Sequence, residues 1–271
     1  MWKADYHIHS ISPDAGVSME SMCLAAVERG LEEIAFTDHY EFYAHGIHRE
    51  YFDRAYLERY FRELRKVKQE FAGRLRIRCG VEMGQLHLDR KEAFQIIRSY
   101  PFDFIIGSLH KIENVDLGAA DFTGRTVPAL AESYYRHLLL LSEEGEFDCL
   151  GHLDLFKRYA RRNGFPDYEE VYMPLIEEVL KNIIARGKGI EINTSGVRQG
   201  NTGCMPELSV LKLYRRLGGR ILTIGSDAHR PGDVGADLDT ALRLAVEAGF
   251  EELASYSRRC VKFQKIQEEN K

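Results

Sequence analysis

The sequence predicts an α/β fold in which a parallel sheet closes into a seven-stranded relative of the TIM barrel. Seven short apolar segments alternate with segments that have the spacing of amphipathic helices, a pattern typical of parallel sheets. Histidine or carboxylate side chains follow six of these seven segments. A doubly wound open sheet would spread those side chains along one edge. A closed barrel gathers them at its carboxyl end, where such folds hold their active sites.

The predicted strands are short, apolar and separated by turn residues. In chain order they cover residues 3–8, 33–37, 75–81, 102–106, 147–150, 189–193 and 221–224. The predicted helices cover residues 19–29, about 53–71, 90–99, 128–143, 168–186, 206 to about 217, and 236–248. Ser18 is the expected N-cap of the first helix and Gly30 its stop. The tail, residues 254–266, is expected to add a strand or a helix.

Length and composition predict a single domain, residues 1–271. This length fits one α/β barrel, which typically has about 250 residues, and 44% hydrophobic residues can fill its core. The net charge of −5 gives no basic stripe for nucleic acid or membranes. The five cysteines are scattered and the amino terminus lacks a signal-peptide core. We therefore expect a cytoplasmic protein that binds neither nucleic acid nor membranes, and no feature predicts its oligomeric state.

Two histidines at the end of the first strand begin a predicted metal site. His7 and His9 are two residues apart, so both imidazoles of an extended backbone point to one face and can bind one ion. Such a pair is common by chance, but similar residues follow the later strands. Imidazoles and carboxylates are ligands for zinc and similar divalent ions. The later positions are Asp38, His39, Glu82, His110, His152, Asp227 and His229.

Seven short motifs carry these residues in a specific order. They are His-x-His, Ser-Pro-Asp, Thr-Asp-His, Gly-Val-Glu, Gly-Ser-Leu-His, Gly-His-Leu-Asp and Gly-Ser-Asp-Ala-His, from residue 3 to about residue 235. In this order they resemble the PHP (polymerase and histidinol phosphatase) family. The stretches around 191–196, 206–207 and 224–229 resemble its histidinol-phosphate phosphatase branch.

The resemblance implies a distorted (β/α)7 barrel with three divalent metal ions, of zinc, manganese or iron. It implies a first ion bound by His7, His9, Glu82 and Asp227. Glu82 would bridge to a second ion held by His110 and His152. The third ion would be bound by Asp14, His39 and His229.

Three aspartates near these motifs have a second interpretation. Asp14 follows Pro13 and is also a typical turn residue. Asp38 and Asp154 are interpreted as carboxylates that orient a neighbouring imidazole, with capping of a loop as the alternative.

The predicted cluster suits hydrolysis of a phosphate monoester, with Asp227, His229 and Glu82 as catalytic residues. Metal ions lower the pKa of bound water to about 7, so a metal-bound hydroxide can attack phosphorus without a covalent enzyme intermediate. The resemblance implies L-histidinol phosphate as the small-molecule substrate, with L-histidinol and inorganic phosphate as products of this step in histidine synthesis.

Arginines beyond the fifth and sixth strands are candidates for binding the phosphate, because guanidinium donors match phosphate oxygens. Arg158 and Arg198 are the first choices, with Arg161 as the substitute for Arg158. Lys157 and Arg162 are expected to be solvated charges.

The loop of residues 40–43, with His45 and His48, has two interpretations. It lines a recess for the amino and imidazole groups, with Glu41 binding the substrate, or it is an ordinary surface loop with packed aromatic side chains.

Four other functions are weighed against this one. A PHP phosphatase for a nucleotide or sugar phosphate stays open, because the cluster recognises only phosphate. An amidohydrolase-like enzyme would usually have lysine where this chain has Glu82. A DNA-processing nuclease is disfavoured by the acidic charge balance. A binding module without activity is disfavoured because all expected ligand positions are filled.

Overall fold

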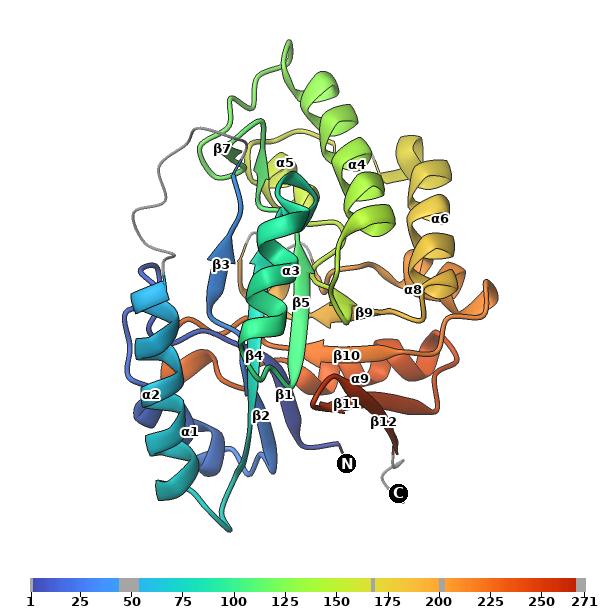
Figure 1. Cartoon of the computed structure of the whole chain (residues 1–271). Helices are drawn as coiled ribbons and strands as arrows, with labels where there is room; N and C mark the ends of the chain where they lie inside the picture. Colours follow the sequence, from blue (N-terminus) through green and yellow to red (C-terminus); the bar gives the residue numbers. More distant parts are fainter. Residues whose placement is uncertain (1, 44–53, 167–168, 200–202, 267–271) are drawn as a thin grey trace.

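The computed structural model describes residues 2–43, 54–166, 169–199 and 203–266, and a curved parallel sheet forms its centre (Figure 1). All seven predicted strands are present, close to their predicted bounds. The sheet runs in the order β1-β2-β4-β5-β8-β9-β10. These strands are Ala4–Ile8, Glu33–Phe36, Arg76–Gly84, Phe104–Ser108, Cys149–Leu150, Gly189–Asn193 and Leu222–Gly225.

The two ends of this sheet meet, which confirms the predicted barrel. Strand β10 approaches β1 through a parallel bridge between Ile8 and Ala228. The amide of His9 donates to the carbonyl of Ala228 at 2.9 Å, and the amide of Asp227 donates to the carbonyl of His7 at 2.8 Å. Closure therefore joins the first metal motif of the sequence to the last one.

Seven helices match the predictions from the sequence. They are α1 (Met19–Glu28), α2 (Arg54–Glu70), α3 (Arg90–Ser99), α4 (Val127–Glu144), α6 (Glu169–Ala185), α8 (Leu208–Arg216) and α9 (Leu238–Glu247). The side chain of Ser18 caps α1 by accepting from the amide of Ser21, as predicted, and Gly30 follows at a φ of 70°. Within the described residues, no helix is long and apolar enough to cross a membrane.

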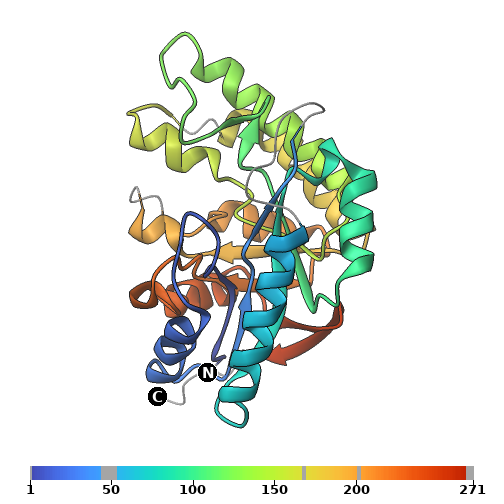
Figure 2. The same cartoon turned by 60° about the vertical axis from the view of Figure 1, so that its left-hand side comes forward.

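Several short elements were not predicted. They are β3 (His39–Glu41), which pairs with β4, the helices α5 (Phe156–Arg162) and α7 (Ser195–Arg198), the hairpin β6–β7 (Lys111–Ile112 and Val115–Asp116), and the 3₁₀ turns η1 (Leu86–Leu88) and η2 (Pro231–Asp233). Most of them belong to loops that follow the barrel strands. Figures 1 and 2 show α5 and β7 at the same end of the molecule.

The other end of the barrel is covered by the chain's tail. It forms an antiparallel hairpin of β11 (Glu252–Ser257) and β12 (Cys260–Lys265), which confirms the strand prediction (Figure 1). Tyr256 packs on Phe104 with ring centroids 4.8 Å apart, and its amide donates to the hydroxyl of Tyr6 at 2.9 Å. A small apolar cluster thus seals the amino end of the barrel and leaves the carboxyl end for the site.

Candidate metal centre and pocket

Glu82 lies at the centre of the carboxyl end of the barrel. It follows the apolar part of β4, its side chain is fully buried, and its Oε1 accepts a hydrogen bond from Ser108 Oγ at 2.6 Å. Ring nitrogens of five imidazoles lie within 3.4 Å of its two oxygens: those of His7, His9, His39, His110 and His152. A buried carboxylate surrounded in this way is typical of a group shared between bound cations.

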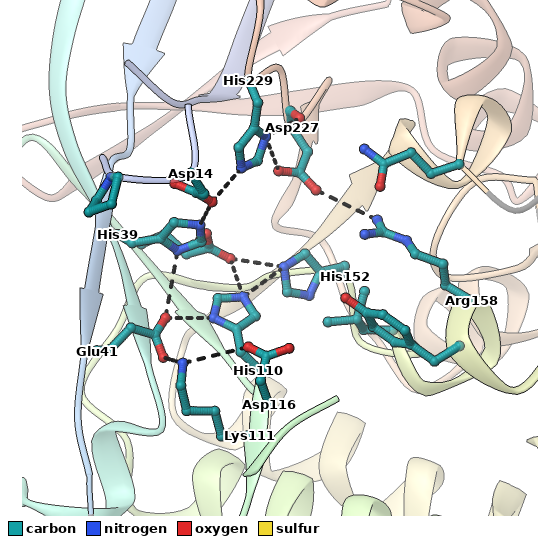
Figure 3. A pocket seen from close by; sticks show the side chains of 15 residues that line it. Asp14, His39, Glu41, His110, Lys111, Asp116, His152, Arg158, Asp227 and His229 are labelled. Carbon is teal, nitrogen blue, oxygen red and sulfur yellow. Dashed lines mark hydrogen bonds and ion pairs between the residues drawn. The ribbon is translucent and has the colours of Figure 1, made fainter. Parts of the chain in front are cut away.

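Two further carboxylates extend the cluster. Asp227 Oδ1 lies 3.3 Å from His9 Nε2 and 3.6 Å from His229 Nδ1. Asp14 Oδ2 lies 3.0 Å from His39 Nε2 and 2.9 Å from His229 Nε2 (Figure 3). The structure therefore brings together all nine residues that the sequence analysis named as metal ligands. Their individual ligand roles remain predictions.

The donor set fits divalent metal ions. Groups of three side chains offer ligand atoms within 4.8 Å of one another: His9, His39 and His229; His7, Glu82 and His152; His7, His9 and Asp227. Among the described residues, both ring nitrogens of His9 and Nε2 of His7 are buried without a hydrogen-bond partner. Buried polar atoms rarely stay unpaired, so these nitrogens point to an ion as the missing partner.

The electrostatics of the cluster also favour cations. Burial, together with the neighbouring imidazoles of His229 and His39, lowers the pKa of His9 to about 3, so its ring keeps a lone pair for a metal. Burial alone would raise the pKa of Glu82, but the imidazoles of His7, His110 and His39 hold it well below its usual value. The carboxylate therefore stays negative among the imidazoles.

Glu191 holds two of the predicted metal ligands in position, and the sequence analysis did not name it as a site residue. It is buried on β9, where its Oε1 lies 2.7 Å from Nδ1 of His7 and its Oε2 accepts from the amide of His152 at 3.0 Å. A carboxylate on Nδ1 fixes the ring so that Nε2 faces the cluster. The signal that could have found it is a glutamate inside an otherwise apolar strand.

Glu41, which was predicted to bind the substrate, lies beside His110. It borders the pocket, but its side chain is buried and is engaged by three groups. Nδ1 of His110 lies at 2.7 Å, Lys111 Nζ at 2.6 Å and Gln85 Nε2 at 2.7 Å. These contacts occupy the carboxylate and position His110, and substrate binding by Glu41 stays a prediction.

The segment around Glu41 is not an ordinary surface loop. Residues His39–Glu41 form β3, which pairs with β4, and Tyr40 and Phe42 are buried in the core. Their packing carries Glu41 to the floor of the pocket. His45 and His48 lie outside the described residues.

Two aspartates that were expected to orient imidazoles do something else. Asp38 accepts hydrogen bonds from the amides of Ser10 and Ser12, at 2.7 and 2.8 Å, so the alternative of a loop cap is confirmed. Asp154 forms a 2.6 Å ion pair with Lys157, and both side chains are fully buried. The expectation that Lys157 is solvated was therefore wrong, whereas Arg162 is exposed as expected.

Arg158 is the predicted arginine that reaches the pocket. It projects from α5, donates through Nη2 to Ser195 Oγ, and lies 3.7 Å from Asp227 Oδ2 (Figure 3). Arg198 instead donates to the carbonyl of Ser226 at 2.6 Å and faces the carboxylates of η2 and the loop before α9, and Arg161 is bound to Glu207 at 2.8 Å. Of the three predicted arginines, Arg158 is the one in the described pocket lining, and phosphate binding by Arg161 and Arg198 stays a prediction.

The pocket has a volume of about 520 Å³ and opens over the cluster. Opposite the predicted ligands it is lined by residues that the sequence analysis did not name as site residues: Lys111, Asp116, Leu155, Tyr159 and Gln199. They come from the β6–β7 hairpin, α5 and the end of α7, which are short elements without a clear periodic pattern. The pocket thus joins the cluster of imidazoles and carboxylates and Arg158 to a wall of mixed polarity.

An α/β barrel with this cluster at its carboxyl end defines a class of proteins that bind divalent metal ions. The model of the PHP domain matches residues 5–195, and the chain belongs to the PHP domain family. Histidinol-phosphatase of Lactococcus lactis is 31% identical over 267 residues, with 95% of each chain covered. The probable histidinol-phosphatase of Clostridium acetobutylicum is 28% identical over 263 residues, covering 96% of this chain and 98% of the relative.

A solved structure of a histidinol phosphate phosphatase has the same fold as this chain. Histidinol phosphate phosphatase from Lactococcus lactis, complexed with zinc, L-histidinol and phosphate, superposes with a TM-score of 0.81 at 29% identity. The match covers 96% of this chain and 99% of that one. The putative histidinol phosphatase of Listeria monocytogenes superposes with a TM-score of 0.72 at 19% identity, which supports the fold alone.

Proposed function

We propose that this chain is a metal-dependent phosphatase that hydrolyses L-histidinol phosphate to L-histidinol and inorganic phosphate, a step of histidine synthesis. The observation that carries the proposal is the pocket in which the histidine and carboxylate cluster faces Arg158. Relatives named histidinol-phosphatase match nearly the whole chain. The related Lactococcus lactis enzyme holds zinc, L-histidinol and phosphate, which are the cofactor and products of this reaction.

We propose three divalent ions, of zinc, manganese or iron, in this cluster. The grouping of His7, His9 and Asp227 supports the ligand set of the first ion, and the closeness of His39 and His229 supports that of the third. His7, His9, Glu82 and Asp227 would bind the first ion, Glu82, His110 and His152 the second, and Asp14, His39 and His229 the third.

The chain's own residues would bind the phosphate beside these ions. Bound divalent ions lower the pKa of water and neutralise charge on phosphoryl oxygens. Arg158 lines the pocket and supplies a fixed cation there, and guanidinium donors match phosphate oxygens. Asp227 lies between the imidazole cluster and Arg158. Its Oδ1 faces the imidazole of His9, and its Oδ2 accepts from Ser195 Oγ at 3.0 Å, the hydroxyl to which Arg158 also donates.

The substrate is tested with a panel of phosphate esters. The purified, metal-loaded enzyme is assayed for phosphate release from L-histidinol phosphate, AMP, a sugar phosphate and an aryl phosphate. We expect the highest kcat/KM on L-histidinol phosphate, and a chelator should abolish all activity. Chelator-sensitive activity that peaks on AMP or on the sugar phosphate would establish the alternative, a PHP phosphatase for another small ester.

Replacing Glu191 with glutamine should weaken metal binding by about 10- to 100-fold, the usual effect of losing a carboxylate behind a histidine ligand. Glu191 accepts hydrogen bonds through both carboxylate oxygens: Oε2 accepts from the His152 amide and Asn193 Nδ2, and Oε1 lies beside His7 Nδ1. Glutamine has only one oxygen and would lose one of these two sets of contacts. The measurement is a competition titration with a chelator, read as bound metal. Asp148→Asn is the control, since that buried carboxylate pairs with Arg259 away from the pocket. Equal affinities in both variants would contradict the role of Glu191.

The remaining expectations form part of the proposal. We propose that residues 1–271 act as one barrel domain in the cytoplasm and bind a small phosphate ester, with no nucleic-acid or membrane partner. The net charge of −5 and the extent of the structural match, 96% of the chain, support it.

A further inference from the structure

Two carboxylates of the pocket, Glu41 and Asp116, lie outside the predicted metal cluster. Five carboxylates line the described part of the pocket: Asp14, Glu41, Glu82, Asp116 and Asp227. Three of them belong to the cluster, and Glu41 is filled by His110, Lys111 and Gln85. Asp116 is the one that has no such commitment. Its side chain is 52% exposed, which is more than that of any of the other four.

Asp116 is held in place by one oxygen and presents the other. It lies on β7, where its Oδ1 accepts from the amide of Gly118 at 2.7 Å. A Cβ at position 118 would come within 3.1 Å of this oxygen, so glycine permits the close approach. The nearest cation to Oδ2 is Lys111 Nζ at 3.8 Å, beyond hydrogen-bond distance.

Lys111 is paired more closely with Glu41 than with Asp116. Its ammonium lies 2.6 Å from Glu41 Oε2 and 3.8 Å from Asp116 Oδ2. Lys111 is thus shared unequally between two carboxylates, and its closer contact is with Glu41. Asp116 keeps an exposed carboxylate oxygen that Lys111 does not reach within hydrogen-bond distance, and a cationic group of a ligand can approach it from the pocket.

The wall beside Asp116 continues to the phosphate site. A Cβ at Gly118 would touch both Asp116 and the ring of Tyr159, at 3.1 and 3.5 Å, so these groups are neighbours. Tyr159 adjoins Arg158 on α5, and both line the pocket. Figure 3 shows Asp116 and Arg158 on different sides of His152. A phosphate ester anchored at the cluster and Arg158 can thus extend along this wall toward Asp116.

We propose that Asp116 determines substrate specificity by binding the protonated primary amine of a phosphorylated amino alcohol. The inference rests on the proposed function, in which the ester carries both an amine and an imidazole. The amine is the better partner for a carboxylate at neutral pH, because it stays charged, whereas an imidazole with a pKa of about 6.5 is mostly neutral. A site built to bind a polar group discriminates strongly against a substrate that lacks it.

The test compares Asp116→Asn with the wild-type enzyme on two esters, L-histidinol phosphate and the same ester without its amino group. Asparagine can keep the hydrogen bond to Gly118 through its oxygen while it loses the charge. We expect kcat/KM for L-histidinol phosphate to fall by about 10- to 100-fold, mainly through KM, as for a lost hydrogen bond to a charged group. The ester without the amine should change by less than about twofold, since it makes no such contact. Asp116→Glu should restore part of the loss.

The matched control is Glu113→Gln. Glu113 is an exposed acid in the turn of the same hairpin and does not belong to the described pocket lining, so its removal changes net charge equally and should leave both esters unaffected. Equal losses on the two esters would overturn the inference and make Asp116 a support for the hairpin. Unchanged kinetics on both would overturn it as well. A wild-type enzyme without preference for L-histidinol phosphate would instead refute the proposed function itself.

Discussion

Replacing Glu82 with glutamine is expected to abolish turnover, with kcat reduced by at least about 10³-fold. Glutamine keeps the shape of the side chain but removes the negative charge of the carboxylate, whose two oxygens each face a pair of imidazoles. Oε1 lies within 3.0 Å of His110 and His152, while Oε2 lies within 3.4 Å of His7 and His9. A bound metal supplies several kcal/mol of transition-state stabilisation, and each 1.36 kcal/mol corresponds to about tenfold in rate.

The experiment measures bound metal and kcat on the same preparations. Glu82→Gln should lose part of its metal content as well as its activity. Glu33→Gln is the matched control, because Glu33 is also a buried carboxylate on a barrel strand but pairs with Tyr6 and Arg78 away from the pocket. The control should keep its full metal content. Glu82→Gln with wild-type metal content and activity would rule out the cluster as the catalytic centre.

Most of the metal cluster could be predicted from the sequence because its residues stand at the ends of successive predicted strands, whereas Asp14, in the loop before α1, came from the family resemblance. His7 and His9, Glu82 and Asp227 all follow apolar strand segments, so the periodicity that predicts the barrel also predicts their meeting point. The backbone alone brings these positions together. No long-range side-chain contact has to be known in advance.

The supporting residues could not be predicted in the same way. The role of Glu191 depends on its contact with His7, which is 184 positions away in the chain. The position of Asp116 depends on the β6–β7 hairpin and on its contacts with Gly118 and Lys111. The contacts of Glu41 with His110, Lys111 and Gln85 could not be predicted, because they depend on the pairing of β3 with β4. Such contacts depend on tertiary packing, which leaves no periodic trace in the sequence.

Charged residues close in sequence can have opposite environments, as α5 shows. Lys157 is fully buried, Arg158 reaches the pocket and Arg161 is bound to Glu207 at the surface. A run of basic residues therefore does not indicate solvation by itself. On a short helix packed against a site, the position of each side chain on the helix decides its role.

Replacing Lys157 with methionine is expected to destabilise the fold by about 3–5 kcal/mol, the usual cost of leaving one member of a buried ion pair without its partner. Lys157 Nζ lies 2.6 Å from Asp154 Oδ2 and 3.3 Å from Glu207 Oε1, and it donates to the carbonyl of Cys204 at 3.3 Å. Methionine fills a similar volume, so the loss reports the charge and the hydrogen bonds. The measurement is the free energy of unfolding from denaturant titration of the complete chain.

Two further variants separate the buried pair from a general effect of charge. Adding Asp154→Asn to Lys157→Met removes the unpaired carboxylate and should recover part of the stability. Lys181→Met is the matched control on α6, where an ion pair with Glu177 is 56% exposed at the lysine and should contribute no more than about 1 kcal/mol. Because Lys157 precedes Arg158 on α5, the buried pair also fixes the helix that carries the phosphate-binding arginine. Equal unfolding free energies for Lys157→Met and Lys181→Met would show that the buried pair does not hold α5 in place.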